Sequence, residues 1–159
     1  MSNEKTNVMR ILDKAHIPYD AIYYEHRDKE AVDGITVAQL TGMDEHCVFK
    51  TLVLRGVNKN IYIFVIPVCC ELDLKKAARS VCEKAVQMVH VNEINSLTGY
   101  IRGGCSPIGM RKKFKTVFHR TIINLPYIMV SAGKIGCQVR LKPDDLLSLV
   151  DGDVADIII

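Results

Sequence analysis

The sequence has few of the features that mark membrane, metal-binding or disulfide-stabilised proteins. Its longest apolar run, residues 61–70, is far shorter than the roughly 20 residues that a membrane-spanning helix requires. Its six cysteines form no C-x-x-C pair and its five histidines form no close H-x-x-x-H pair, so no metal site is predicted. The first ten residues contain no apolar stretch that resembles a signal peptide. We therefore expect a cytoplasmic protein with reduced thiols and no membrane association.

The excess of positive charge is also small. The 159 residues carry a formal net charge of +3, which suits a polyanionic partner but lies far below the basic excess of a dedicated nucleic-acid-binding protein. Hydrophobic residues make up 48% of the chain, which is enough to bury one sizeable core. We expect residues 1–159 to form a single domain, because no repeat, linker or low-complexity segment divides them.

The spacing of apolar residues predicts an α+β domain. Helices are expected near residues 8–15, 36–40, 73–81 and 144–150, and strands near 19–26, 48–55, 61–68, 86–89, 114–118, 127–132 and 137–141. Short turns join 48–55 to 61–68 and 127–132 to 137–141, so both pairs are predicted to be antiparallel hairpins. These elements favour one mixed, mainly antiparallel sheet surrounded by short helices.

Lys50 is a charged residue within an apolar strand. Strand alternation places it on the same face as Val48 and Leu52, while Phe49 and Val53 make the other face apolar too. Because an ammonium group taken out of water needs compensation, Lys50 is expected to face an internal carboxylate or to line a cleft for an anionic or carbonyl-bearing ligand. The alternative is a lysine at a strand end whose side chain reaches solvent.

The segment 103–109, Gly-Gly-Cys-Ser-Pro-Ile-Gly, is a candidate ligand-binding loop. Its glycines let the backbone approach a ligand and can direct successive N–H groups at a carbonyl oxygen or a phosphate. Such a loop could form an oxyanion site, and its alternative is an ordinary wide turn between strands. A second segment, 131–136, lacks the spacing of a phosphate-binding P-loop and is better explained as a hairpin turn.

Two further groups of residues have both a functional and a structural interpretation. Arg111, Lys112 and Lys113 begin a basic run suited to contacts with an RNA backbone, although most such runs are solvated surface. Cys105 or Cys70 could act as a nucleophile with a histidine, but no local signature pairs them, and buried cysteines are commonly small apolar residues.

Several motifs occur in a distinctive order along the chain. They are VFKTLV at 48–53, VIPV at 65–68 followed by LDLK at 72–75, TGYIRGGCSPIG at 98–109 and VSAGK at 130–134. In order and spacing they resemble the YbaK family of Cys-tRNA(Pro) deacylases, over a region from about residue 23 to the C-terminus.

The resemblance implies a fold, an activity and partners. The implied fold is a compact, mixed, barrel-like sheet with surrounding helices, related to the editing domain inserted in bacterial prolyl-tRNA synthetases. Members of the family act in trans on mischarged tRNA and hydrolyse the ester between the amino acid and the terminal adenosine. The expected partners are therefore tRNA(Pro) and prolyl-tRNA synthetase, and no cofactor is implied.

The resemblance also assigns roles to particular residues. Lys50 resembles the family's essential lysine and is expected to hold the terminal phosphate or ester region by its charge. Backbone N–H groups near Gly104 are expected to stabilise the oxyanion that forms when the carbonyl is attacked, so both residues are expected to be catalytic. For a cysteinyl substrate, the implied attacking group is the amino acid's own thiol. The expected substrate contacts are Tyr24, Ser106, Ser131 and Gly133, and the expected RNA contacts are Arg111, Lys112 and Lys113.

The chain departs from the family's pattern at a few positions. Cys105 stands where many relatives have an aliphatic residue, Ile135 where they commonly have a basic one, and Gln138 where some have an acidic one. The resemblance therefore leaves the amino acid open, since related proteins also remove alanine or other small residues. The alternative functions are a non-catalytic module that binds aminoacyl-tRNA or a nucleotide alongside a synthetase, and a cysteine hydrolase that uses Cys105.

Overall fold

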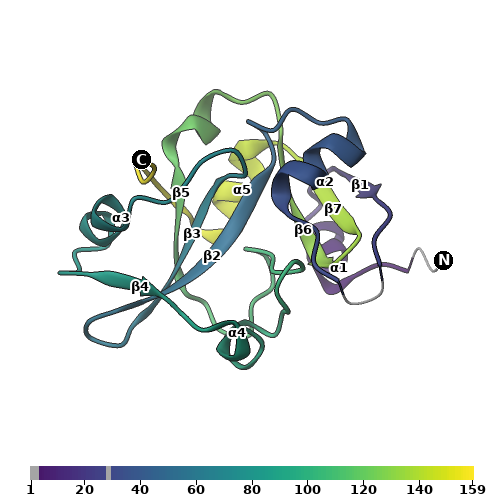
Figure 1. Ribbon diagram of the computed structural model, residues 1–159. Coiled ribbons are helices and arrows are strands. Elements are labelled where there is room, and N and C mark those ends of the chain that lie inside the picture. Colours follow the sequence, from purple (N-terminus) through teal and green to yellow (C-terminus); the bar gives the residue numbers. More distant parts are fainter. Residues whose placement is uncertain (1–3, 28–29) are drawn as a thin grey trace.

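Two β-sheets and five α-helices make up the described residues, 4–27 and 30–159, of this computed structural model (Figure 1). The helices are α1 Asn7–Lys14, α2 Gly34–Thr41, α3 Leu74–Ser80, α4 Val91–Thr98 and α5 Pro143–Val150, with a 3-10 helix at Arg120–Asn124. The strands are β1 Tyr19–Tyr23, β2 Phe49–Gly56, β3 Ile61–Pro67, β4 Val86–Met88, β5 Lys115–His119, β6 Ile128–Lys134, β7 Cys137–Leu141 and β8 Asp153–Ala155.

The larger sheet has the strand order β4-β2-β3-β5-β8. Strand β2 pairs antiparallel with β3 and β4, whereas β5 pairs parallel with β3 and β8. Strand β3 is buried on both faces, because Ile63 and Val65 pack into one apolar cluster while Phe64 and Ile66 pack into another. Burial on both faces explains why the sequence of this strand is apolar throughout.

The smaller sheet, with the order β1-β7-β6, is antiparallel. It meets the larger sheet at a parallel β-bridge between Val48 and Met129, where the Met129 N–H donates to the Cys47 carbonyl at 2.9 Å. Strand β4 pairs only with residues 54–56 of β2. The first half of β2 is therefore open on the edge that faces β6.

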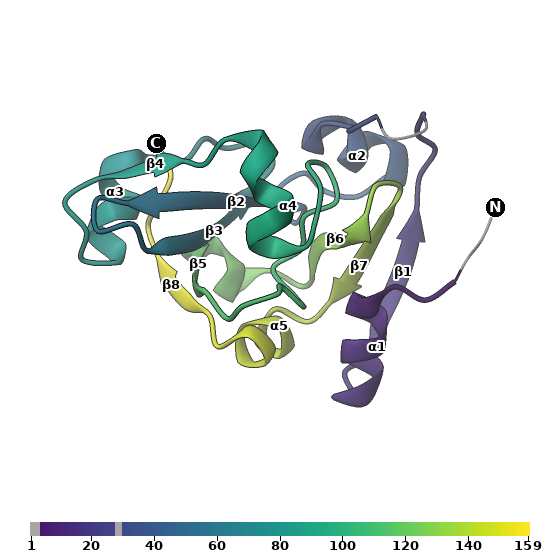
Figure 2. The ribbon, with the colours of Figure 1, turned by 90° about the horizontal axis from the view of Figure 1, so that it is seen from below.

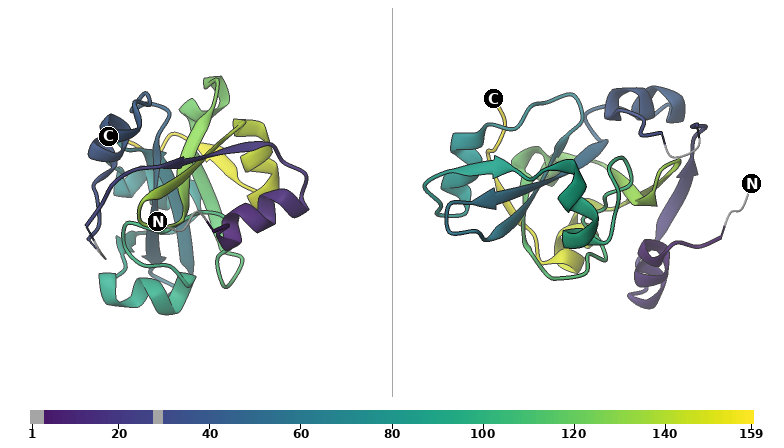
Figure 3. Two further views of the ribbon diagram at one scale, coloured as in Figure 1. Left: turned by 90° about the vertical axis from the view of Figure 1, so that its right-hand side faces the viewer. Right: turned by 60° about the horizontal axis from the view of Figure 1, so that its bottom comes forward.

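The helices cover three apolar clusters. Val8 and Leu12 of α1 and Leu146 of α5 pack between the two sheets, and these two helices lie on the same side of the molecule (Figure 3). Helix α3 covers the opposite face of the larger sheet. Helix α2 packs over the junction of the two sheets through Val37 and Ala38. No helix in the described part of the chain is long and apolar enough to cross a membrane.

The expected α+β class and both expected antiparallel hairpins are confirmed. The barrel-like closure implied by the resemblance is wrong for the described strands, which form two sheets. Closure is prevented because β4 and β8 are the edge strands of the larger sheet and neither continues the pairing into the smaller one.

Three elements were not predicted from the sequence: α4, the 3-10 helix at Arg120–Asn124 and β8. Helix α4 has only Thr98 fully buried, and its apolar residues Ile94 and Leu97 pack against the main apolar cluster while only partly buried. Polar contacts add to this packing: Glu93 accepts a hydrogen bond from the His90 N–H at 3.2 Å and from the Arg55 guanidinium of β2 at 3.1 Å. Strand β8 has three residues, too few for a recognisable alternation.

Replacing Phe64 with alanine tests the two-sided burial of β3. Phe64→Ala is expected to lower the free energy of unfolding by about 3–5 kcal/mol, because a fully buried ring is replaced by a cavity. Urea denaturation measures this change. Val57→Ala, in the exposed turn after β2, is the control and should stay within about 0.5 kcal/mol of wild type. Similar effects of the two substitutions would contradict the burial described here.

Candidate functional site

A small cleft opens where the two sheets diverge. It lies between the start of β2, the β6–β7 hairpin, helix α2 and the loop that follows α4, which runs beside β6 (Figure 2). Its volume is about 120 Å³, the share of about four water molecules in the liquid, which suits an amino-acid side chain better than a nucleoside. The lining residues are Tyr24, Val32, Gly34, Val37, Val48, Phe49, Lys50, Thr51, Val68, Gly103, Cys105, Ser131 and Gln138.

Three buried polar atoms in this cleft have no hydrogen-bond partner within residues 4–27 and 30–159. They are the Tyr24 hydroxyl oxygen, Thr51 Oγ1 and Gln138 Oε1. Leaving one such group unpaired in a protein interior costs about 1–3 kcal/mol. Because all three gather in one cleft, the cleft is suited to a polar ligand that would supply the missing partners.

Lys50 lies at this cleft and is only partly buried. Its ammonium group makes no ion pair or hydrogen bond with the described part of the chain. The structure therefore places Lys50 at a cleft and not beside an internal carboxylate. The positive charge is available to an anionic or carbonyl-bearing group.

Ser131 lines the cleft from the smaller sheet. Lys50 and Ser131 each follow the bridged pair Val48–Met129 by two residues, so the two strands bring them to the same site. The Ser131 hydroxyl accepts a hydrogen bond from the Gly133 N–H at 3.1 Å. Gly133 itself does not line the cleft. Its φ of 96° favours glycine and helps to form the turn that holds Ser131.

Tyr24 follows β1 and closes another side of the cleft. Its backbone N–H donates to the Gly136 carbonyl at 3.0 Å. Its ring packs edge-on against His26, with the ring centroids 6.4 Å apart. These contacts hold the ring, with its unpaired hydroxyl, against the cleft.

The glycine loop packs closely against two other segments. A Cβ at Gly103, whose φ is 86°, would lie 2.8 Å from the Ala31 side chain. A Cβ at Gly104 would lie 3.0 Å from the Cα of Lys134, the last residue of β6. Side chains at these two positions would push the loop away, so glycine keeps it at the cleft.

The hydrogen bonding of this loop differs from the expectation for Gly104. The Gly104 N–H already donates to the Ile101 carbonyl at 3.0 Å, and Gly104 does not line the cleft. Gly103 and Cys105, on either side, do line it. Their N–H groups make no hydrogen bond with the described residues.

Four of the remaining predicted site residues lie outside the cleft. Ser106 is fully buried, and its hydroxyl accepts a hydrogen bond from the Ile108 N–H at 3.2 Å, so it holds the loop together. Arg111, Lys112 and Lys113 are exposed. Lys112 and Lys113 border a separate hollow of about 260 Å³ beside α1 and α5.

The thiols in and beside the cleft are not activated. Burial raises the pKa of the Cys105 thiol to about 11. Burial, and then the neighbouring Cys70, raise the pKa of Cys69 to about 11. Cys105 makes no hydrogen bond with a described histidine, so its sulfur stays protonated near neutral pH. These observations argue against Cys105 as a nucleophile.

Thr51 and Gln138 were not selected from the sequence as site residues. Gln138 pairs with Ser131 in the β6–β7 register and is only 6% exposed. Along β7, however, Gln138 and Arg140 alternate with apolar residues, a pattern that indicates a solvent-facing side. The burial of Gln138 could therefore not be predicted from the sequence pattern of β7.

Comparison with known proteins connects this site to a family. Residues 29–149 match the aminoacyl-tRNA editing domain family. The chain is also 40% identical over 156 residues to an Enterococcus faecalis protein with the provisional name Cys-tRNA(Pro)/Cys-tRNA(Cys) deacylase EbsC. That alignment covers 98% of this chain and 94% of the relative.

Two solved structures share the fold. One is provisionally described as a trans-editing enzyme for prolyl-tRNA synthetase. It matches with a TM-score of 0.82 at 23% identity, and the match covers 98% of this chain and 99% of the chain in that structure. The other is described as a hypothetical protein and has a TM-score of 0.86 at 20% identity. That match covers 97% of this chain and 100% of the chain in that structure. At these identities the likeness shows the fold alone. The family match and the E. faecalis relative go further and confirm the resemblance found in the sequence: the chain belongs to the aminoacyl-tRNA editing domain family.

Proposed function

We propose that this protein is a trans-acting deacylase that hydrolyses the ester of mischarged tRNA, with Cys-tRNA(Pro) as its main substrate. The observation that carries the proposal is the cleft itself, in which an unpaired lysine lies beside three unpaired buried polar atoms. The name of the E. faecalis relative supports the choice of substrate. In this proposal tRNA(Pro) is the nucleic-acid partner and prolyl-tRNA synthetase the protein that produces the mischarged substrate.

The cleft suits the end of an aminoacyl-tRNA in size and chemistry. Its volume of about 120 Å³ accommodates the amino acid and leaves the adenosine at the mouth. Lys50 attracts the terminal phosphate or the ester region. The Tyr24 hydroxyl, Thr51 Oγ1 and Gln138 Oε1 are placed to pair with the polar groups of the aminoacyl moiety, which orients its carbonyl.

The glycine loop is the proposed oxyanion site. Because the Gly104 N–H is bound within the loop, we assign this role to the N–H groups of Gly103 and Cys105. Donors fixed in a water-poor cleft stabilise the charge that develops on the carbonyl oxygen during attack. Gly104 would act indirectly, by allowing the loop to lie against the β6–β7 turn.

The proposed nucleophile belongs to the substrate. A few per cent of a free thiol is thiolate near pH 7, enough for a cysteinyl group to attack its own ester carbonyl. A C–S bond then forms while the C–O bond to the ribose breaks, and the released ribose oxygen takes up a proton. Water hydrolyses the resulting thiolactone to free cysteine. The inactive state of the Cys105 thiol supports this route over a protein nucleophile.

Lys50→Ala tests the role of the ammonium group. We expect it to slow single-turnover hydrolysis of Cys-tRNA(Pro) by about 10²–10³-fold, the usual effect of removing one electrostatic contact to a transition state. Ala-tRNA(Pro) and Pro-tRNA(Pro) are compared in the same assay and should react more slowly with wild type. Lys75→Ala, at an exposed position of α3, is the matched control and should leave the rate unchanged.

The same assay also tests whether the protein is an enzyme. If wild type hydrolyses none of the three esters faster than buffer does, the deacylase proposal fails for these substrates. A protein that binds aminoacyl-tRNA without cleaving it would then be the better description.

Cys105→Ser and Cys105→Ala distinguish the two nucleophiles. Because the Cys105 thiol is protonated near neutral pH, both variants should keep the rate on Cys-tRNA(Pro) within about tenfold of wild type. Cys82→Ser, which removes an exposed thiol, is the control. A much larger loss in both Cys105 variants would show that the protein's own thiol takes part in the chemistry.

Tyr24→Phe is expected to change stability and activity in opposite directions. The substitution removes a buried hydroxyl that has no partner in the described residues, so the free energy of unfolding should rise by about 1 kcal/mol. Deacylation should fall by about 10- to 100-fold if that hydroxyl orients the substrate. Urea denaturation and single-turnover kinetics measure the two effects. A loss of stability together with activity would instead indicate a structural role for the hydroxyl.

A further inference from the structure

Two tight turns lie side by side at the open end of the β2–β3 hairpin, opposite the turn that connects the two strands. One precedes β2, where the Cys47 N–H donates to the Asp44 carbonyl at 2.8 Å. The other follows β3, where the Cys70 N–H donates to the Pro67 carbonyl at 3.0 Å. The Val68 N–H donates to the Val48 carbonyl at 2.8 Å and joins the two turns.

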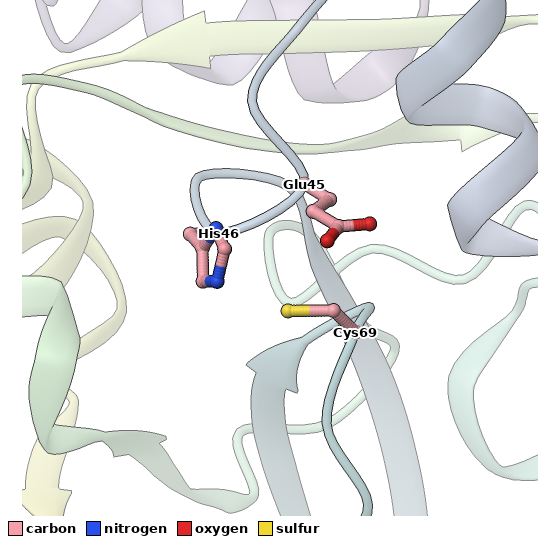
Figure 4. Close-up of side chains that lie close together, drawn as sticks. All are labelled: Glu45, His46 and Cys69. Carbon is pink, nitrogen blue, oxygen red and sulfur yellow. The ribbon is translucent and has the colours of Figure 1, made fainter.

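Three side chains of different ligand types extend from these turns into a common space. They are Glu45 and His46 from the first turn and Cys69 from the second (Figure 4). A carboxylate oxygen, an imidazole nitrogen and the sulfur all lie within 4.8 Å of one another. In a tetrahedral zinc site, bonds of about 2.0–2.3 Å place ligand atoms about 3.3–3.8 Å apart. Small side-chain rotations would therefore bring the three ligand atoms from within 4.8 Å of one another to the spacing of a zinc site.

The imidazole of His46 is already oriented. Asp44 Oδ1 accepts hydrogen bonds from the His46 backbone N–H at 2.9 Å and from its Nδ1 at 3.0 Å. This contact leaves the lone pair on Nε2. A carboxylate that holds one imidazole nitrogen while the other binds a metal is a recurrent arrangement in zinc proteins.

A second thiol lies beside the first. The sulfur of Cys70 is 3.9 Å from that of Cys69. Two thiolates bound to one tetrahedral zinc ion are about 3.8 Å apart, given Zn–S bonds of about 2.3 Å. Cys70 is not in the group whose ligand atoms all lie within 4.8 Å of one another, so it is not counted among the ligands.

We propose that Glu45, His46 and Cys69 form a binding site for a zinc ion, with Asp44 as the residue that orients His46. Mixed carboxylate, imidazole and thiolate ligands favour Zn²⁺ over Mg²⁺ and Ca²⁺, which bind oxygen ligands. The ion would connect the turn before β2 to the turn after β3. Their neighbours Val48 and Val68 line the cleft, so the ion would fix one rim of it. Cys69 follows the adjacent pair Glu45 and His46 by 23 to 24 residues, a spacing that neither the H-x-x-x-H nor the C-x-x-C pattern contains.

Cobalt titration of the EDTA-treated full-length protein tests this site without a deacylase assay. Co²⁺ is a visible substitute for Zn²⁺, and its bond to a thiolate adds a charge-transfer absorption band. We expect this band to appear with one equivalent per chain and to be displaced by Zn²⁺. Cys69→Ser should abolish the band, and His46→Ala should weaken Co²⁺ binding at least tenfold. Asp44→Asn should weaken it about 10- to 100-fold, as loss of an orienting carboxylate usually does.

Two control variants separate this site from other exposed ligands. Cys82→Ser and His16→Ala remove an exposed thiol and an exposed imidazole elsewhere and should leave the titration unchanged. The proposal is overturned if wild type gives no thiolate band, if Cys69→Ser retains it, or if Cys82→Ser removes it. Since no tRNA enters the experiment, its outcome does not depend on the proposed deacylase activity.

Discussion

The arrangement of this site depends on one contact between the two sheets. At the Val48–Met129 bridge, the Met129 N–H donates to the Cys47 carbonyl and brings β2 and β6 together over a single pair of residues. Beyond the bridge the strands diverge, because β2 pairs with β3 while β6 pairs with β7. Alternation sends Phe49 and Val130 into the core between the sheets. The residues that follow these two, Lys50 and Ser131, lie at the cleft.

Much of the fold follows from local sequence signals. The hairpins could be predicted because their turns and apolar runs are adjacent in the chain, and the helix at Leu74–Ser80 because Asp73 caps it, accepting from the Lys75 and Lys76 N–H groups. Helix α4 was not predicted, and one of its stabilising contacts, the ion pair between Glu93 and Arg55, joins residues 38 positions apart and gives no local signal. The separation into two sheets depends on which strands take the edges, and the three-residue edge strand β8 leaves almost no trace in the sequence.

The candidate site was predictable to a smaller degree. Lys50, Tyr24 and Ser131 lie at the cleft as expected. Ser106, Gly104 and Gly133 lie behind it, because the loop and the turn use their polar groups and small size for their own folding. The motif identifies the segment that approaches the ligand, but the backbone conformation decides which of its residues face inward. Burial of a polar side chain depends on distant strands, so local alternation does not reveal it.

The glycine loop follows a helix that is held by an ion pair outside the cleft. Helix α4 leads directly into the loop, and Glu93 of this helix is bound to Arg55 on the same strand as Lys50. The hydrogen bond from Arg55, and then that from the His90 N–H, lower the pKa of Glu93. A carboxylate with a lowered pKa adds stability above its unfolded pKa and loses this contribution as the pH falls through the folded value. The ion pair therefore persists throughout the neutral range, and its contribution is lost only when the pH falls below the usual pKa of a glutamate. One acid-sensitive contact thus joins the strand of Lys50 to the helix that leads into the glycine loop, at a distance from the reacting groups.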